Sequence, residues 1–477
     1  MRAKSRLVRK FPSVASCLAA FLGLLFLTSS LSQRAEALPA FARKYGLRCS
    51  ACHEAWPMLN YFGQKFKDNG YQLMNDRDSP IWQNPGYWPV TFRITPYWHR
   101  ESTDKVAVDS VTGDASSAPM EHQVTQHGFD LSGLDFHTGG TLEKNFSFYV
   151  LPSSDATASF HFETVMARLD NLGGSPWLNI KLGKFELDNL ISEKRILTLT
   201  SISGVYQTYH FIPQGDANIW GQIGDNQLGI EYMGHSADDR TRVSAALLST
   251  SDGNVNLAAG TNSYTGFITA SQAFDTGKLG VQRVGFYAMA GQAPITFLTS
   301  SGVPVLGTGS NQKGFSREGF VGLFYLKKLD FLVLTQHGMD NVWFGQGYGN
   351  ATDPNNGSSG LDGLNCIPGS CTLPTTARTP IWNGYMVETH YVYNPQLIFF
   401  QRSEWERMQQ QASTSYASNF GNLDMYTFGY RWYPIMNPRA GFALHNEYSW
   451  IRQRGTSPVT GTDLTSSSLL LGFDFDF

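Results

Sequence analysis

The chain has 477 residues and a formal net charge of −3, with 16% charged and 13% aromatic residues. The net charge falls to about −8 once the basic N-terminal stretch is removed. This argues against a nucleic-acid partner, because proteins that bind nucleic acids neutralise its phosphates with a surplus of Lys and Arg. No apolar run of about 20 residues follows that stretch, so no membrane-spanning helix is predicted. Frequent Gly and aromatic residues with few charges are typical of a membrane β-barrel, where lipid-facing and water-facing side chains alternate.

Residues 1–37 have the three parts of a secretory signal. Basic residues lie between Arg2 and Lys10, an apolar run extends from Cys17 to Leu27, and Ala35-Glu36-Ala37 forms an A-x-A cleavage site. We therefore expect a mature protein that begins at Leu38 and is exported from the cytoplasm.

The most informative motif follows soon after this signal. Cys49-Ser50-Ala51-Cys52-His53 is a C-x-x-C-H box, the spacing that lets two thiols form thioethers to one haem while the next histidine binds the iron. A plain disulfide would not require His53, and a zinc site would need two more soft ligands nearby. The box therefore predicts one covalent haem c held by Cys49, Cys52 and His53.

Residues 38–88 form a small segment around this box. A helix is predicted from Trp56-Pro57, with Pro57 near its first turn, and Asn69-Gly70 ends it. Leu59, Phe62 and Phe66 recur at helical spacing, and this apolar stripe packs either on the haem or on the rest of the protein. About 50 residues bury little surface alone, so we expect the segment to lodge in, or cap, the following domain.

Period-two alternation begins near residue 89 and continues to the end of the chain. Leu469, Leu471, Phe473, Phe475 and Phe477 fall at every second position, with Gly472, Asp474 and Asp476 between them, and a final strand that ends in Phe resembles that of outer-membrane barrels. About 16 strands are predicted in 89–477, separated by short links and by longer Gly/Ser/Asn-rich stretches at 104–120, 250–263, 298–313 and 345–380 that resemble external loops. The predicted fold is mainly β: an outer-membrane β-barrel of about 16 antiparallel strands, with the N-terminal α-helical haem c segment plugging its lumen.

The sixth haem ligand is left open by the sequence. Met74 is the better local methionine, because Met58 lies too close to the box to reach the opposite face of the haem, and His99 is the nearest other histidine. Histidines on the early strands could also reach the lumen: His122, His127, His137 and His161.

Cations around the box would either pair with the haem propionates or form a solvated face. They are Arg43, Lys44, Arg48, Lys65 and Lys67.

Cys366 and Cys371 lie in a loop-like stretch of Gly, Asn, Pro and Ser. In an oxidising compartment such a pair predicts a short disulfide loop, with a redox role as the alternative.

Residues 38–75 resemble the signature of the fused outer-membrane cytochrome–porins. The matching residues are Pro39, Phe41-Ala42-Arg43, Gly46, the C-x-x-C-H box, Pro57, Leu59, Phe62-Gly63, Phe66-Lys67 and Gly70-Tyr71. The resemblance implies one N-terminal haem c joined to a barrel of about 16 strands. It also implies iron oxidation, because the best-known members of that family pass electrons from extracellular Fe(II) to periplasmic c-type cytochromes. The iron-oxidising members tend to carry Gln-Thr where this chain has Lys44-Tyr45, which suits a sister branch with another donor or outward electron flow.

These observations predict an electron conduit in the bacterial outer membrane, with Fe(II) as the leading external partner and membrane lipid around the barrel. Three alternatives stay open at this point: electron export to an extracellular metal acceptor, a diffusion porin with a structural haem, and a soluble periplasmic cytochrome with a β-domain. No nucleophile–base constellation or phosphate loop points to another enzyme class.

Overall fold

The protein is described here from a computed structural model. The residues that the structure describes are 41, 45, 47–55, 58–73, 90–109, 119–143, 145–154, 159–190, 223, 226–249, 264–293, 295–297, 303, 306, 313–340, 364–366, 378–410, 422–436, 440–455 and 460–476. The predicted signal at residues 1–37 lies outside them, as do Met74, Cys371 and Phe477.

A small N-terminal unit precedes the barrel. It consists of a single-turn helix α3 (Cys49–Cys52), a hairpin of β1 (His53–Ala55) and β2 (Met58–Leu59), and the helix α4 (Tyr61–Asp68). No helix among the described residues is long and apolar enough to cross a membrane.

Sixteen antiparallel strands close into one barrel, in which the first strand β3 pairs with the last strand β20. In chain order the barrel strands are β3 (Val90–Asp109), β4 (Pro119–Glu143), β5 (Phe146–Ser154), β6 (Phe160–Leu169), β7 (Asn179–Glu186), β8 (Asn226–His235), β9 (Thr241–Ser249), β10 (Tyr264–Asp275), β11 (Val281–Ala293), β13 (Lys313–Leu326), β14 (Leu329–Met339), β16 (Ile381–Asn394), β17 (Leu397–Gln410), β18 (Leu423–Met436), β19 (Gly441–Gln453) and β20 (Leu464–Asp476). A separate two-stranded sheet joins β12 (Ile295–Phe297) and β15 (Leu364–Cys366). The predicted strand number is confirmed.

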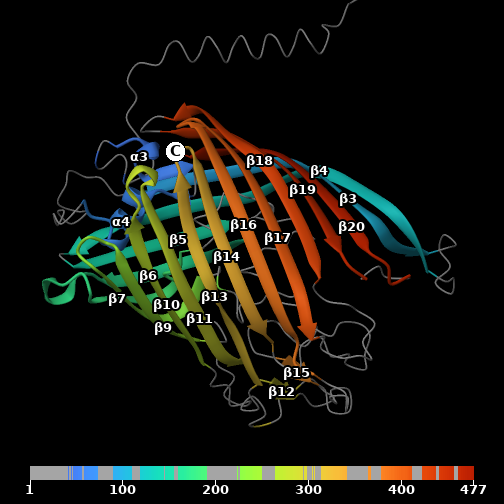
Figure 1. Cartoon of the computed structure of the whole chain (residues 1–477), viewed down its shortest axis with the longest axis horizontal. Helices are drawn as coiled ribbons and strands as arrows, with labels where there is room; N and C mark the ends of the chain where they lie inside the picture. The colour runs from blue at the N-terminus through green and yellow to red at the C-terminus, as the bar shows by residue number, and fades with distance from the viewer. Residues whose placement is uncertain are drawn as a thin grey trace, which may run out of the picture.

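The two ends of the barrel differ in their connections. One end carries short links such as 327–328 between β13 and β14 and 395–396 between β16 and β17, together with the ends of β3 and β20 that meet there. The other end carries every connection longer than 170–178, which joins β6 to β7 at the short-link end. The helices α3 and α4 lie at the short-link end, near the C-terminus (Figure 1). In outer-membrane barrels the short turns face the periplasm, so the N-terminal unit lies at the periplasmic end.

The predicted external loops mostly fall on the long connections. The stretch 104–120 is the exception, because β3 continues to Asp109 and β4 starts at Pro119, so this pair of strands projects well beyond its neighbours. In Figure 1 the two strands extend past the rest of the barrel, away from α3 and α4. The alternation of polar residues with Val and Ala in this stretch suits a paired ribbon as well as a loop.

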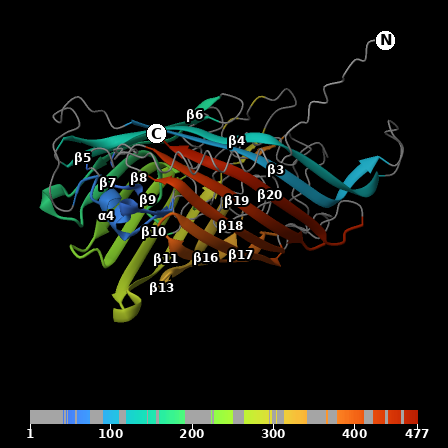
Figure 2. The same cartoon turned by 90° about the horizontal axis from the view of Figure 1, so that it is seen from above.

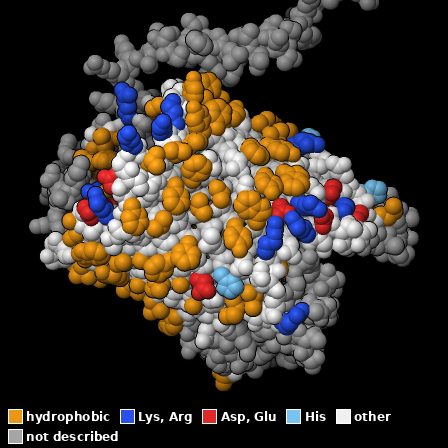
Figure 3. All heavy atoms as spheres, in the orientation of Figure 1, with side chains coloured by type: hydrophobic (Ala, Val, Ile, Leu, Met, Phe, Trp, Pro, Cys, Tyr) orange, Lys and Arg blue, Asp and Glu red, His pale blue; other side chains and the backbone are white. Residues whose placement is uncertain are grey.

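The two faces of the barrel wall have opposite chemistry. Strand β19 alternates between buried and more exposed positions throughout its length: Glu447 is buried, whereas its neighbour Tyr448 is exposed. Large apolar side chains are exposed on the outer wall: Ile230, Leu247, Ile268, Phe286, Phe320, Tyr385, Phe399, Phe428, Tyr448 and Leu471. Figure 3 shows one face of the molecule, where hydrophobic side chains cover much of the barrel surface and most charged side chains lie towards its borders.

A closed barrel leaves no unpaired strand edge, and an outward apolar band is stable only against lipid. The even strand number, the short turns at one end and the long connections at the other complete the pattern of a bacterial outer-membrane protein. The predicted location in the outer membrane is therefore confirmed, and the soluble alternative is wrong.

Candidate functional site in the N-terminal unit

The C-x-x-C-H box adopts a compact turn at the start of the described chain. Cys49 and Cys52 bound the single turn of α3, and His53 begins β1 directly after it. Cys52 and His53 are half-buried, and Cys52 is a free thiol. Burial raises the pKa of the Cys52 thiol to about 11, opposite to the lowered pKa of a redox-active C-x-x-C thiol.

The helix after the box begins later than predicted. Met58 and Leu59 form the strand β2, which pairs with His53–Ala55, and α4 starts only at Tyr61. The expectation of a helix that includes Met58 and Leu59 is therefore wrong, because these two residues pair with the box as a strand. Trp56 and Pro57 lie outside the described residues. The predicted end is confirmed: α4 ends at Asp68, and Gly70 takes a left-handed φ of 72°.

Asn60 joins the box to α4 through all of its polar groups. Its backbone N–H donates to the Cys52 carbonyl at 2.9 Å, and its amide Nδ2 donates to the carbonyls of Ala51 at 3.0 Å and Ser50 at 3.3 Å. Its Oδ1 accepts from the backbone N–H of Gly63 at 2.9 Å, which caps the first turn of α4. Sequence reasoning missed Asn60, although an Asn directly before a helix is the signal for such a cap.

Gly63 lets the two helices touch. A Cβ at this position would lie 2.1 Å from the Cys52 carbonyl oxygen, so no larger residue fits without movement of the backbone. The box therefore rests directly on the backbone of α4, which has few ways to shift relative to the two cysteines.

The C-terminal end of α4 is fixed to one wall of the barrel. Arg168 on β6 donates to the carbonyls of Lys67 at 2.7 Å and Asp68 at 2.9 Å, and it pairs with Asp170 at 2.8 Å. Arg242 on β9 pairs with the Asp68 carboxylate at 2.5 Å. The guanidinium of Arg168 thus satisfies the last carbonyls of the helix, where its dipole favours a positive charge.

Lys67 was considered as a partner for the haem propionates. It instead pairs with Glu186 on β7 at 2.8 Å, which holds α4 to the wall. Arg48 is exposed, and Lys65 is half-buried in the last turn of α4. Arg43 and Lys44 lie outside the described residues.

An aromatic cluster extends the same contact. Phe66 meets the rings of Phe41 at 5.2 Å and Tyr45 at 5.6 Å, both edge-on, and Tyr71 stacks on Phe41 at 5.0 Å and on Tyr149 of β5 at 5.9 Å. These residues belong to a large buried cluster that includes wall residues of β6, β7 and β9. Of the two roles left open for the apolar stripe, Phe66 takes the one on the barrel wall.

The hairpin before α4 reaches a different part of the wall. Met58 is buried in a cluster with Ile398, Phe400, Tyr433 and Ala443, which belong to β17, β18 and β19. In the ring of sixteen strands, β18 lies eight positions from β8, directly across the lumen from the wall that holds α4. The N-terminal unit therefore makes contacts on opposite walls, and Figure 2 shows α4 within the arc formed by β5 to β10.

The predicted distal ligands are dispersed. His99 lies 3.6 Å from Glu101 on the inner side of β3, and His137 is hydrogen-bonded to the hydroxyl of Tyr149 at 2.6 Å. His122, His127 and His161 are exposed. Met58 packs on the wall, and Met74 lies outside the described residues, so its assignment stays a prediction.

The predicted disulfide between Cys366 and Cys371 stays a prediction. Cys366 ends the short strand β15, which pairs with β12, and Cys371 falls outside the described residues. Among the residues that the structure describes, no group of three or more His, Cys, Asp or Glu side chains is arranged to hold a metal ion.

The residues of the box fit a covalently attached haem. Two cysteines lie one helical turn apart, the next residue is a histidine, and Cys52 is unpaired. Attachment would add the Cys52 S–H across a haem vinyl group, with the sulfur on one carbon and the hydrogen on the other, so the buried sulfur would then carry no ionisable proton.

Comparison with known proteins finds similar structures but no family. No family model matches the chain, and no curated protein matches it. Similar solved structures include an anion-selective porin from Comamonas acidovorans (10% identity, TM-score 0.48, covering 81% of this chain and 98% of that one) and OmpF from Salmonella typhi in complex with daunomycin (9%, 0.45, 81% and 97%). The outer-membrane channel DcaP of Acinetobacter baumannii is similar at 11% identity, with a TM-score of 0.42 and coverage of 81% and 97%. At this level the likeness carries no argument about transport or substrate.

Proposed function

We propose that the protein is an outer-membrane electron conduit that carries one haem c in its N-terminal unit. The observation that carries the proposal is the C-x-x-C-H turn, fixed by Asn60 and Gly63 to a helix that is itself fixed inside the barrel wall. Attachment to Cys49 and Cys52, with His53 on the iron, would supply one-electron reduction and oxidation.

The barrel gives this haem a purpose. The apolar layer of such a membrane is about 25 Å thick and insulating, and a redox centre inside a protein-lined lumen divides that gap. The box lies at the short-link end, so electron exchange with a periplasmic c-type cytochrome would be the short step. Contacts on opposite walls by Met58 and by the end of α4 support a role for the unit as a plug.

Fe(II) is the proposed external donor, on the resemblance of residues 38–75 to the cytochrome–porins. The test uses purified haem-loaded protein: Fe(II) should convert its absorption spectrum to the reduced form, and the reduced protein should be reoxidised by a soluble c-type cytochrome. Failure of Fe(II) to reduce a haem that dithionite does reduce would reject Fe(II) as donor. A protein without thioether-bound haem would reject the conduit.

A diffusion porin is the second candidate, because the barrel is closed and has the strand number of a general porin. Proteoliposomes separate the two. A plugged conduit should leave them sealed to small sugars, whereas a porin should make them swell. Removal of residues 38–73 should open the conduit, and this variant controls for correct barrel insertion.

The direction of electron flow is tested by the reduction potential. A high potential suits uptake from Fe(II), whereas a low potential suits export to an extracellular metal acceptor such as ferric oxide.

A further inference from the structure

The inner wall opposite the docked end of α4 carries a row of buried side chains on β19. This row, the β19 file, consists, from the periplasmic end, of Ala443 and the polar residues His445, Glu447 and Ser449, each at most 1% exposed. His445 Nε2 contacts Glu447 Oε1, and its Nδ1 lies 4.0 Å from Asp474 of β20. The file thus places an imidazole between two carboxylates in a region closed to solvent.

The periplasmic end of the file meets the N-terminal unit. Ala443 and Phe400 share the buried cluster of Met58, and the ring of His445 lies edge-on to Phe400 at 5.7 Å. Met58 belongs to the hairpin whose other strand begins with His53. Only one layer of side chains therefore separates His445 from the hairpin that carries the proposed haem ligand.

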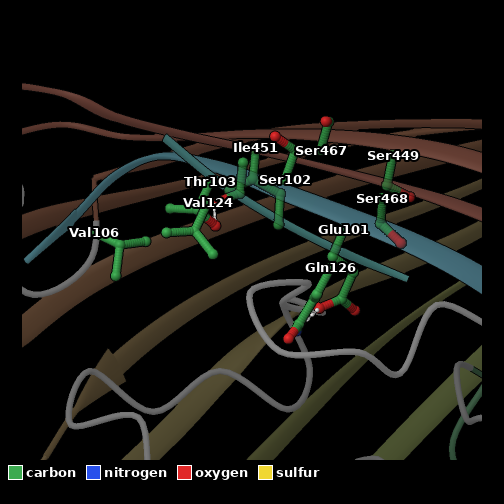
Figure 4. Close-up of a pocket in the computed structure, with 11 residues that line it drawn as sticks. Glu101, Ser102, Thr103, Val106, Val124, Gln126, Ser449, Ile451, Ser467 and Ser468 are labelled. Atoms are coloured by element: carbon green, nitrogen blue, oxygen red, sulfur yellow. Dashed lines mark hydrogen bonds between the residues drawn. The ribbon is translucent and has the colours of Figure 1, made fainter. Parts of the chain in front are cut away.

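The other end of the file meets a cavity of about 250 Å³ on the side of the long connections. Ser449 of β19 pairs with Ser468 of β20, and Ser468 pairs with Glu101 of β3, so three lining residues lie at one level of the wall. Ser468 is buried, and its hydroxyl has no hydrogen-bond partner among the described residues. Figure 4 shows this lining, with Gln126 beside Glu101, to whose carboxylate its Nε2 donates at 3.1 Å.

From Ser449 at the level of this cavity, Glu447 lies two residues nearer the periplasmic end, a step of about 7 Å along a strand. His445 lies two residues nearer still, and Ala443, beside Met58, is two residues beyond His445 in the same direction. Polar side chains thus run along a single strand from the cavity to His445, and Ala443 and Phe400 lie between His445 and the N-terminal unit. Imidazole and carboxylate groups are the side chains that most often transfer protons in proteins.

Charged groups from every neighbouring strand face this route. Those nearest to His445 are Glu447 on β19, Arg431 on β18 and Asp474 on β20, and further along the inner wall lie Arg402 and Glu404 on β17, Glu388 and His390 on β16, Asp476 on β20 and Arg93 on β3. Arg431 has no exposed surface, and its three guanidinium nitrogens have no hydrogen-bond partner among the described residues; Nη1 lies 3.6 Å from Asp474. Carboxylates outnumber arginines among these groups, so the file offers several sites that can accept a proton.

We propose that this file takes up a proton from the cavity when the haem is reduced, so that the protein couples electron transfer to proton transfer. The inference rests on the proposed function. One electron from Fe(II) or an electrode would reduce the haem, and one proton would pass from a hydronium ion through the cavity to the His445–Glu447–Asp474 group. An O–H bond of the hydronium ion breaks and a new N–H or O–H bond forms in the group. The charges of the electron and the proton cancel, so the net charge of the buried region stays constant, which a low-dielectric interior favours.

The test is a spectroelectrochemical titration of the full haem-loaded protein in detergent between about pH 5 and 8. If reduction is coupled to protonation, the reduction potential should fall as the pH rises. For one proton per electron, the equilibrium constant of reduction changes by at most tenfold per pH unit. His445→Gln and Glu447→Gln should each flatten this slope. His127→Gln, the same substitution at an exposed position of β4, should keep it.

Proton uptake can also be measured directly, with an indicator dye in weak buffer during reduction at an electrode. Wild-type protein should take up protons, and the two file variants should take up fewer. Ser468→Leu, which fills the cavity, should leave the slope unchanged and slow the uptake; an unchanged rate would overturn the cavity as the point of access.

A potential that is independent of pH in the wild type would overturn the proposal, as would a full slope in both file variants. Absence of the thioether-haem absorption band is a different result, because it would reject the conduit itself. If His445→Gln fails to insert as a barrel, Glu447→Gln alone still decides the outcome.

Discussion

The backbone N–H of Asn60 donates to the carbonyl oxygen of Cys52 at 2.9 Å, so the residue that caps α4 is bonded directly to the second cysteine of the box. The same residue also binds the carbonyls of Ser50 and Ala51 through its side chain. The shape of the box and the start of the helix are therefore set together.

Asn60→Ala should lower the yield of haem-loaded protein and loosen the N-terminal unit. Loss of the cap costs about 1 kcal/mol, and the side-chain bonds to the box are lost as well. Asn60→Ser keeps a side-chain oxygen that can accept from the N–H of Gly63 and lacks the Nδ2 donor, so its haem-to-protein ratio should lie between those of Ala and wild type. Equal ratios for all three proteins would contradict the role of Asn60.

Gly63→Ala tests the contact between α3 and α4 with opposing expectations. Helix propensity alone would stabilise α4 by about 1 kcal/mol, whereas the new Cβ would clash with the Cys52 carbonyl. We expect the clash to dominate, with reduced haem incorporation as the measured result. Gly128→Ala, at a position with open space around the new Cβ, is the matched control and should load haem normally.

Asp68→Asn and Arg242→Gln should each release the end of α4 from the wall. Breaking one partner of a buried pair commonly costs about 3–5 kcal/mol, here paid mainly as local undocking of the unit. Faster hydrogen exchange in residues 58–73, with an intact barrel, is the expected readout. The exposed pair Arg452–Asp463 provides the control. Arg452→Gln breaks an ion pair that contributes little to stability, so hydrogen exchange in residues 58–73 should stay as in the wild type.

Cys52 should be a slow nucleophile in protein produced without haem attachment. Its raised thiol pKa, about 11, leaves almost no thiolate at neutral pH, so alkylation should accelerate only as the pH rises towards that value. The raised value also means that burial of the neutral thiol stabilises the fold at neutral pH, and that this contribution is lost as the pH rises through about 11. Rapid alkylation of Cys52 at pH 7 in Cys49→Ala protein would show that the thiol is not buried.

The sequence predicted the barrel well because its signals are local. Period-two alternation at Leu469, Leu471, Phe473 and Phe475 assigns each residue to a face, and the structure keeps that assignment. The same holds for the end of α4, where Asn69-Gly70 imposes a left-handed turn. Such signals need only neighbours in the chain.

The missed features depend on distant residues. Arg168 and Arg242 bind the end of α4 across about 100 and 170 positions of sequence, and no local pattern distinguishes them from lumen arginines. The start of α4 was misplaced for a related reason, because pairing of Met58–Leu59 with His53–Ala55 outweighed a proline signal for a helix start.

Tyr45 offers a final test of how the N-terminal unit is held together. Its hydroxyl donates to the Tyr71 carbonyl at 3.3 Å, and its ring lies edge-on to Phe66, so it joins the segment before the box to the end of α4. Tyr45→Thr removes both contacts, and an aromatic pair alone contributes about 0.5–1.5 kcal/mol. We expect faster proteolysis of the N-terminal unit and a lower haem yield, with the barrel intact. Tyr45→Phe keeps the ring contact and should lie near wild type; equal damage from both substitutions would assign the effect to the hydroxyl instead of the ring.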